Sequence, residues 1–133
     1  MILLEVFLVA DDVRKKLVGV LKDLGRRASD VLGSAVVTNE GMLMASDLPS
    51  DVADPRLVAA MAVAALGIGK RTVAELDQGV LQRVLITGNE GQTVVMSIGD
   101  AHLLTVLVRS DANLGLVFWE MSKAVEEIKK LLY

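Results

Sequence analysis

The feature of this sequence that most limits its fold is an unbroken apolar, alanine-rich segment at residues 57–69. Asp54 followed by Pro55 is typical of a helix start, because aspartate caps the first turn and proline has no N–H to lose there. We therefore expect a helix from Pro55 to about Leu76. Its large apolar residues point several ways around the axis, and alanine or glycine fills most of the rest. Such a helix is expected to be buried on all sides.

Two further helices are predicted near the ends of the chain. The first has an apolar stripe at alternating three- and four-residue spacing, which is the period of a helix. Asp11 and Asp12 leave open whether it is one helix or two, because either residue can cap a new start. The last helix runs from about residue 114 to residue 132. The two apolar stripes consist of Leu3, Val6, Ala10, Val13, Leu17, Val20 and Leu24, and of Leu114, Phe118, Met121, Val125, Ile128 and Leu132.

Five strands are predicted between these helices. Strands 34–38 and 42–46 flank a turn at residues 39–41, and strands 80–87, 92–98 and 101–109 form a meander. If Gly99 and Asp100 form a two-residue loop, Ile98 lies opposite Ala101. Both faces of the meander are then largely apolar and both need a cover. The expected domain occupies residues 12–133, and residues 1–11 form an apolar extension that continues the first helix.

This arrangement predicts a partner. Five strands spaced at about 4.8 Å make a sheet roughly 24 Å wide, whereas one helix is only about 10–12 Å across. The two terminal helices can share one face of the sheet. The middle helix, alone on the other face, leaves part of it bare, and the same helix of a second copy would fill the gap. The alternative is a core helix enclosed by its own chain.

Composition excludes several functional classes. The net charge is −3 and aromatic residues make up only 3% of the chain, so a nucleic-acid partner is not expected. Without cysteine there is no disulfide, thiolate metal site or cysteine nucleophile. Residues 1–10 lack the basic leader of a signal peptide, and residues 57–69 are shorter than the roughly 20 residues of a membrane span. We expect a cytoplasmic protein without membrane insertion.

One motif resembles a phosphate-binding loop. Residues 67–72 contain Gly69 before Lys70, but the required earlier glycine is Ala64 and the required Ser or Thr after the lysine is Arg71. A helix end with two cations, which suit the helix dipole, explains this string better.

Other candidate chemistry is equally incomplete. His102 is the only histidine, and with Ser97 and Asp100 it could suggest a hydrolytic triad. We interpret Ser97 and His102 as a hydrogen-bonded structural pair across two strands, because Asp100 lies in the turn. Three aspartates have spacing that partly fits an oxygen-ligand loop, but their neighbours do not. They are Asp47, Asp51 and Asp54. We predict no enzyme activity, catalytic residue, cofactor or metal.

The order of elements and several local strings resemble the roadblock/dynein light chain family. The match covers roughly residues 12–132, and its specificity lies in the order and spacing of the strings. These are residues 33–37 followed by Gly41, the alanine-rich helix 57–66, Ala74-Glu75-Leu76, Gly79, the strand ending at Gly91, residues 98–104, and Ala112-Asn113-Leu114-Gly115-Leu116-Val117.

The resemblance implies an α+β fold with the order helix-strand-strand-helix-strand-strand-strand-helix. A five-stranded antiparallel sheet would carry one helix on one face and two on the other, an arrangement that profilin shares. It also implies a homodimer or a heterodimer through the third strand and the middle helix, and we expect the homodimer. The dimer or partner interface would include Val58, Met61, Ala62, Ala65, Gly69, Val80, Gln82 and Val84.

The same resemblance implies a function. Members bind Ras-like small GTPases, whose hydrolysis of GTP some of them modulate, or serve as scaffolds in motor and signalling assemblies. We expect a non-catalytic adaptor or regulator of a Ras-like small GTPase. The alternatives are a structural scaffold subunit of a larger hetero-assembly and a profilin-like small-molecule sensor.

Overall fold

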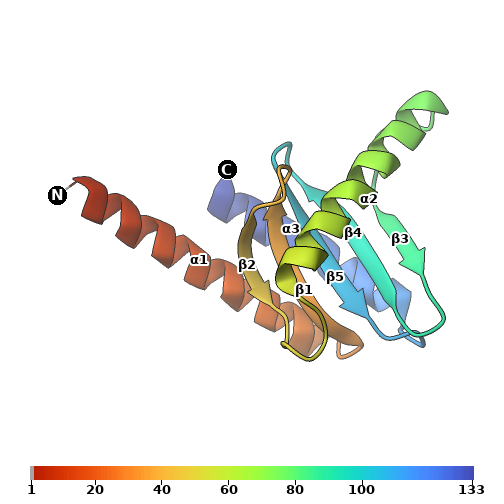
Figure 1. Cartoon of the computed structure of the whole chain (residues 1–133), viewed down its shortest axis with the longest axis horizontal. Helices are drawn as coiled ribbons and strands as arrows, with labels where there is room; N and C mark the ends of the chain where they lie inside the picture. Colours follow the sequence, from red (N-terminus) through yellow and green to blue (C-terminus); the bar gives the residue numbers. More distant parts are fainter. Residues whose placement is uncertain (1) are drawn as a thin grey trace.

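The computed structural model describes residues 2–133, which form three helices and five strands (Figure 1). Met1 lies outside the described residues. The elements are α1 (Ile2–Arg27), β1 (Val31–Thr38), β2 (Leu43–Asp47), α2 (Pro55–Glu75), β3 (Val84–Thr87), β4 (Gln92–Ile98), β5 (His102–Val108) and α3 (Leu114–Leu132).

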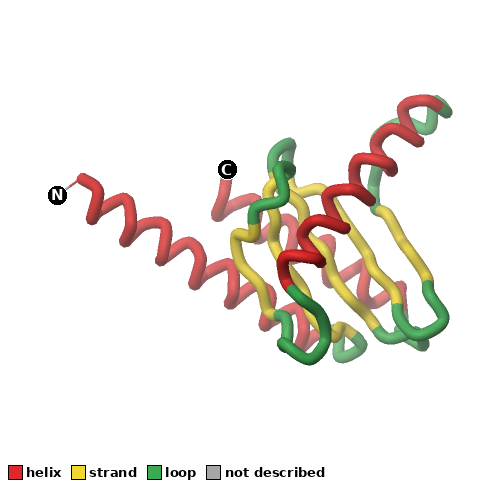
Figure 2. Tube along the Cα trace, viewed as in Figure 1, coloured by secondary structure: helices red, strands yellow, loops and turns green. Residues whose placement is uncertain are grey.

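The strands form one antiparallel sheet in the order β2-β1-β5-β4-β3, so that β2 and β3 are its edges. Helices α1 and α3 lie on one face and α2 crosses the other, as Figures 1 and 2 show. The predicted fold class is therefore confirmed, including the division of one helix against two. Each face needs its cover because β1, β4 and β5 carry apolar side chains on both sides.

Two hydrophobic clusters correspond to the two faces of the sheet. The larger cluster lies between the sheet and the α1–α3 pair, and Leu21, Ile98 and Met121 are among its fully buried members. The smaller cluster lies under α2 and contains Ala35, Val95 and other small or medium side chains. The difference in size leaves the α2 face as the less protected side of the sheet.

α1 is one continuous helix, which settles the alternative of one piece or two. Asp11 and Asp12 do not break it, because they accept salt bridges from Lys15 and Lys16 one turn later, at 3.2 and 3.1 Å. The helix ends at Arg27, and β1 begins four residues later at Val31. The proposed domain boundary at residues 11 and 12 stays a prediction.

The third strand is shorter than predicted. β3 begins at Val84 rather than at residue 80. Leu81 packs into the cluster under α2, so the preceding segment leaves the plane of the sheet instead of continuing along β4.

The predicted register of the β4–β5 hairpin is wrong by one residue. Ile98 pairs with His102 rather than Ala101, so the loop has three residues and Gly99 adopts a left-handed φ of 59°. As a result Leu104 and Val106 face α1 and α3 together with Met96, while Leu103 and Thr105 face α2. Both faces remain apolar, because β5 is buried on each side.

The C-terminal tyrosine explains this longer turn. The Tyr133 hydroxyl donates to the Ile98 carbonyl at 2.8 Å and accepts from the Ala101 N–H at 3.0 Å, so it bridges both arms of the hairpin. The His102 Nδ1 atom lies 2.9 Å from the same oxygen. Because the hydroxyl proton serves Ile98, the His102 tautomer protonated at Nδ1 fits as the second donor.

We predict that Tyr133→Phe destabilises the domain by about 1–2 kcal/mol, because it removes one hydroxyl that serves two backbone groups. The free energy of unfolding in urea measures the effect. Thr72→Ala is the control, since the Thr72 hydroxyl donates only to the Ile68 carbonyl of its own helix. Equal stability of the Tyr133→Phe and wild-type proteins would contradict the proposed role of the bridge.

Candidate partner-binding surface

α2 rests on the sheet through its smallest side chains. Asp54 caps its first turn by accepting from the Arg56 N–H at 2.9 Å, and Pro55 begins the helix as predicted. The helix contacts all five strands. Ala59 and Ala62, each almost fully buried, lie on the inner side of the helix with Leu66. Because two of these contacts are alanine methyl groups, the helix backbone lies close to the strands.

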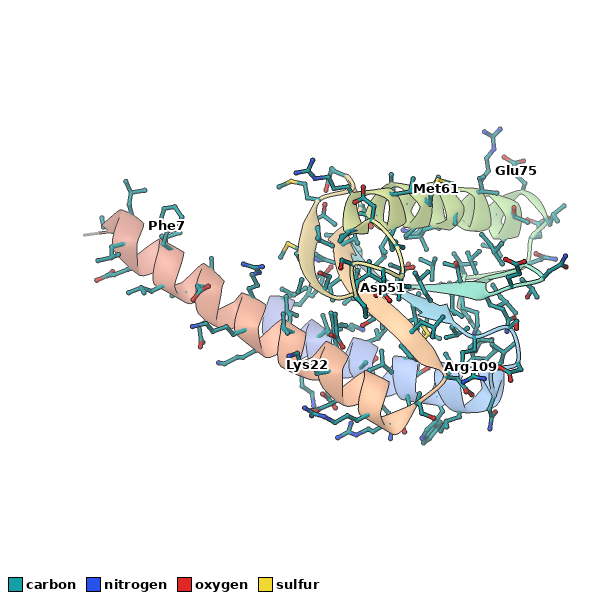
Figure 3. All side chains as sticks on the ribbon, turned by 60° about the horizontal axis from the view of Figure 1, so that its bottom comes forward. Phe7, Lys22, Asp51, Met61, Glu75 and Arg109 are labelled. Atoms are coloured by element: carbon teal, nitrogen blue, oxygen red, sulfur yellow. The ribbon has the colours of Figure 1, made fainter. Side chains whose placement is uncertain are left out.

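Three large apolar side chains of α2 point away from the sheet, whereas Leu66 packs on it. Leu57, Met61 and Ile68 recur at a spacing of four and seven residues and form one stripe along the helix. Met61 is 60% exposed and Ile68 is 70% exposed. Figure 3 shows Met61 on the outer side of the helix, opposite the sheet. The expected burial on all sides is therefore not met within one chain, and a core helix enclosed by its own chain is wrong. We call these three residues the outer ridge.

A groove of about 420 Å³ lies beside the outer ridge. Its sheet side is formed by one cross-strand row, Ile86, Thr93 and Leu107, which pair in register across β3, β4 and β5. Ile86 is exposed and the other two are half-buried. α2 crosses the sheet diagonally and does not cover this row (Figure 1). Part of the apolar α2 face thus remains open, which is the gap that the width argument predicts.

The edge strand β3 adjoins the same surface. A Cβ atom placed on Gly69 would lie only 2.6 Å from a Val84 methyl group and 3.2 Å from Leu81. A glycine at this position therefore allows α2 to approach the start of β3. A second groove between α2 and β3 shares Ala65, Ile68 and Ile86 with the first groove. The outer ridge, the cross-strand row and the free edge of the sheet form one continuous surface.

The structure brings together part of the predicted interface. Val58, Met61, Ala62 and Ala65 all line the main groove, although Ala62 is only 2% exposed and serves mainly its own core. Their role in binding stays a prediction.

The other predicted interface residues take different positions. Gly69 and Val84 pack against each other within the chain. Val80 is 90% exposed in the segment before β3, and Gln82 lines a groove beside α3 on the opposite face of the sheet. The neighbouring Arg83 guanidinium lies 4.4 Å from the centre of the Phe118 ring on α3. Gln82 is therefore separated from the outer ridge by the sheet.

The sequence prediction missed several residues of this surface. On α2 the periodic signal was ambiguous, because the buried and exposed stripes are both apolar at helical spacing. On the sheet the wrong register hid the cross-strand row. The missed residues are Leu57, Ile68, Ile86, Thr93 and Leu107.

The motifs considered for catalysis serve structural roles. Residues 67–72 are helical within α2 rather than part of a loop, but Lys70 and Arg71 lie before its last turn, so the interpretation of a helix end that carries two cations is wrong. His102 contacts Tyr133, and the Ser97–His102 pair is wrong because Ser97 lies opposite Leu103. Among residues 2–133, no group of three or more histidine, cysteine or carboxylate side chains is placed to hold a metal ion.

α2 also requires a correction to the membrane argument. The complete helix has 21 residues and contains an 18-residue window with a mean hydropathy of 1.5, so by length and composition alone it could cross a bilayer. The prediction against a span considered only residues 57–69. In the structure, Ala59, Ala62 and Leu66 pack on the strands, which places the helix in the layer that covers the sheet.

The chain is similar to known proteins in both sequence and structure. A family model described as the Roadblock/LC7 domain matches residues 17–108. An uncharacterized protein of Methanocaldococcus jannaschii is 40% identical over 105 residues, which cover 79% of this chain and 90% of the relative. A second uncharacterized protein of that organism is 39% identical with the same coverage.

Solved structures share the fold at low sequence identity. The Roadblock/LC7 domain from Streptomyces avermitilis has a TM-score of 0.79 at 19% identity, covering 86% of this chain and 96% of that one. Myxococcus xanthus MglB has a TM-score of 0.80 at 19% identity, covering 89% and 88%. Acanthamoeba castellanii profilin II has a TM-score of 0.55 at 12% identity, covering 79% and 90%.

The same substitution should destabilise the protein strongly on the inner side of α2 and only slightly on its outer side. Ala62→Glu places an unpaired carboxylate under the helix and should lower the free energy of unfolding by about 3 kcal/mol or more. Ala60→Glu, at an exposed position two residues earlier, should change it by less than about 1 kcal/mol. Urea denaturation of both variants measures the difference. Equal losses of unfolding free energy in the two variants would contradict the finding that Ala62 faces the sheet and Ala60 faces outward.

Proposed function

The chain belongs to the Roadblock/LC7 domain family, and from this premise we propose that it is a homodimeric cytoplasmic adaptor that binds a Ras-like small GTPase. Its contribution would be non-catalytic: it presents a surface and can modulate GTP hydrolysis by its partner. The resemblance identified from the sequence implies these partners. The similarity to MglB from Myxococcus xanthus supports the fold that this proposal assumes.

The observation that carries this proposal is the uncovered apolar surface made by the outer ridge and the cross-strand row. Leu57, Met61 and Ile68 are exposed on α2, while Ile86 is exposed on the sheet. Contiguous apolar surface of this kind marks an interaction site. A second α2 helix, about 10–12 Å across with its side chains, is a suitable occupant for the space beside the first. The free edge of β3 can pair with the same strand of the second copy.

A small-molecule sensor is the less suitable function for this surface. Ligand pockets combine apolar walls with a few convergent polar groups that fix the ligand. Of the residues that line the main groove, Thr93 alone has a polar side chain. The groove therefore suits an apolar protein surface better than a polar metabolite.

We predict that the wild-type protein is a dimer in solution and that Met61→Glu with Ile68→Glu weakens the dimer at least about tenfold, because each carboxylate would lose water without gaining a partner. Sedimentation equilibrium over a range of concentrations gives the dissociation constant. Trp119→Glu is the control, since Trp119 is similarly exposed but lies on α3, on the other face of the sheet. A strictly monomeric wild type, or an unaffected double variant, rejects this interface.

A second experiment addresses the GTPase. We expect the dimer to bind a Ras-like GTPase from the same organism and to change its rate of GTP hydrolysis, measured as phosphate release with and without the dimer. The double variant Met61→Glu with Ile68→Glu should lose this effect on the rate, because its α2 helices no longer pair in a dimer. Binding without a change in rate favours the alternative role as a scaffold subunit. An absence of binding in either nucleotide state rejects the GTPase as the partner.

A further inference from the structure

The first turns of α1 expose a second apolar surface, far from α2. Residues 2–10 project beyond the body of the domain, and Figure 3 shows Phe7 on this projection while Lys22 lies where the helix is packed. In contrast, burial in the domain core begins at Leu17. Seven large apolar side chains on the projection are 59–77% exposed: Ile2, Leu3, Leu4, Val6, Phe7, Leu8 and Val9. We call residues 2–10 the apolar tip.

The apolar tip is hydrophobic around its whole circumference. Successive residues of a helix are rotated by about 100°, so near-consecutive apolar positions surround the axis. A groove on a protein covers one stripe of a helix, whereas a helix that is apolar all round is typical of burial in a large protein core or in a membrane. Glu5 is the one ionisable side chain between Ile2 and Ala10. These side chains do not belong to the buried core of the chain, so the fold itself does not account for them.

A cluster of cations lies at the base of the apolar tip. Arg14, Lys15 and Lys16 follow it on α1, and Lys130 on α3 lines the same surface groove as Lys16. Four carboxylates accompany them. Asp11 and Asp12 pair with Lys15 and Lys16, and Asp23 and Glu127 line the groove but pair with Arg26 and Arg27. These ion pairs are exposed, so they contribute little and exchange readily for another anion. We call the four basic residues the cationic collar.

We propose that the apolar tip inserts into the surface of an anionic lipid bilayer while the cationic collar contacts the lipid phosphates. Neither signal alone holds a protein firmly on a membrane, but an apolar segment combined with a basic patch does. As a helix, residues 2–10 are about 13 Å long, which is less than half of the roughly 30 Å hydrocarbon core, so the proposed insertion of this segment is shallow.

This binding mode differs from the membrane association that the sequence argued against. That expectation rested on the absence of a signal peptide and of a complete spanning segment. Shallow insertion needs neither. It also leaves α2 and β3 free, so membrane attachment and the proposed dimer use separate surfaces.

Vesicle flotation tests the proposal, using phosphatidylcholine vesicles with and without about 30% phosphatidylglycerol. The wild type should bind the anionic vesicles, and Leu4→Ser with Phe7→Ser should reduce the partition coefficient at least tenfold. Met42→Ser with Trp119→Ser is the matched control, because these two side chains are exposed to a similar degree and lie outside both the apolar tip and the proposed dimer surface. This control should bind vesicles like the wild type.

Three further measurements make the outcome decisive. Arg14→Gln with Lys16→Gln should weaken binding to anionic vesicles severalfold and reduce its dependence on salt, and Glu5→Gln should strengthen binding. The Leu4–Phe7 variant should keep the wild-type melting temperature, since neither side chain packs in the core. Unchanged vesicle binding by this variant overturns the proposal. So does a wild type that stays unbound, or a tip variant that changes only the oligomeric mass without vesicles, which would assign the tip to a protein contact.

Discussion

The close approach of α2 to the sheet is the contact on which the rest of this surface depends. Alanine side chains at positions 59 and 62 allow the helix to lie near the strands, and Gly69 allows the same approach at the start of β3. A helix that packs through small residues must place its large ones elsewhere. Met61 and Ile68 consequently point outward, and the apolar surface that a soluble helix usually hides becomes its exposed side.

The unequal burial on the two faces of the sheet explains how a single chain can be stable although part of its apolar surface is uncovered. The α1–α3 side contains the larger cluster, whose members Leu17, Leu21 and Leu24 anchor the packed half of α1. That side supplies most of the hydrophobic burial within one chain. The α2 side can therefore remain only partly covered and serve as a site for association. The face under α1 and α3 thus stabilises the fold, while the face under α2 is available for binding.

Much of the fold was predictable, because its signals are local. Asp54 and Pro55 define the start of α2, and the bounds of β4 were correct because the strand lies between two glycine-containing turns. The family resemblance was confirmed for the same reason: it rests on the order of such local strings. The interface residues were less predictable. On α2 the buried and exposed positions are all apolar, so periodicity alone could not tell one stripe from the other.

The errors came from contacts between distant residues. Tyr133 determines the turn after Ile98, and Leu81 leaves the path of β3 to pack near Gly69. The residues around Gly99 contain no pattern that predicts a contact with a tyrosine more than thirty residues later. A one-residue shift in a hairpin reverses which side chains face each layer, and it concealed the row of Ile86, Thr93 and Leu107.

The strand order has a consequence for the synthesis of this protein on the ribosome. β1 lies between β2 and β5, so its pairing from Val31 to Val108 joins segments that emerge far apart in time. Until β5 and α3 leave the exit tunnel, neither α1 nor α2 has a complete sheet to pack on. The nascent chain thus displays two apolar helices at once, which is the condition under which chaperones bind and premature aggregation begins.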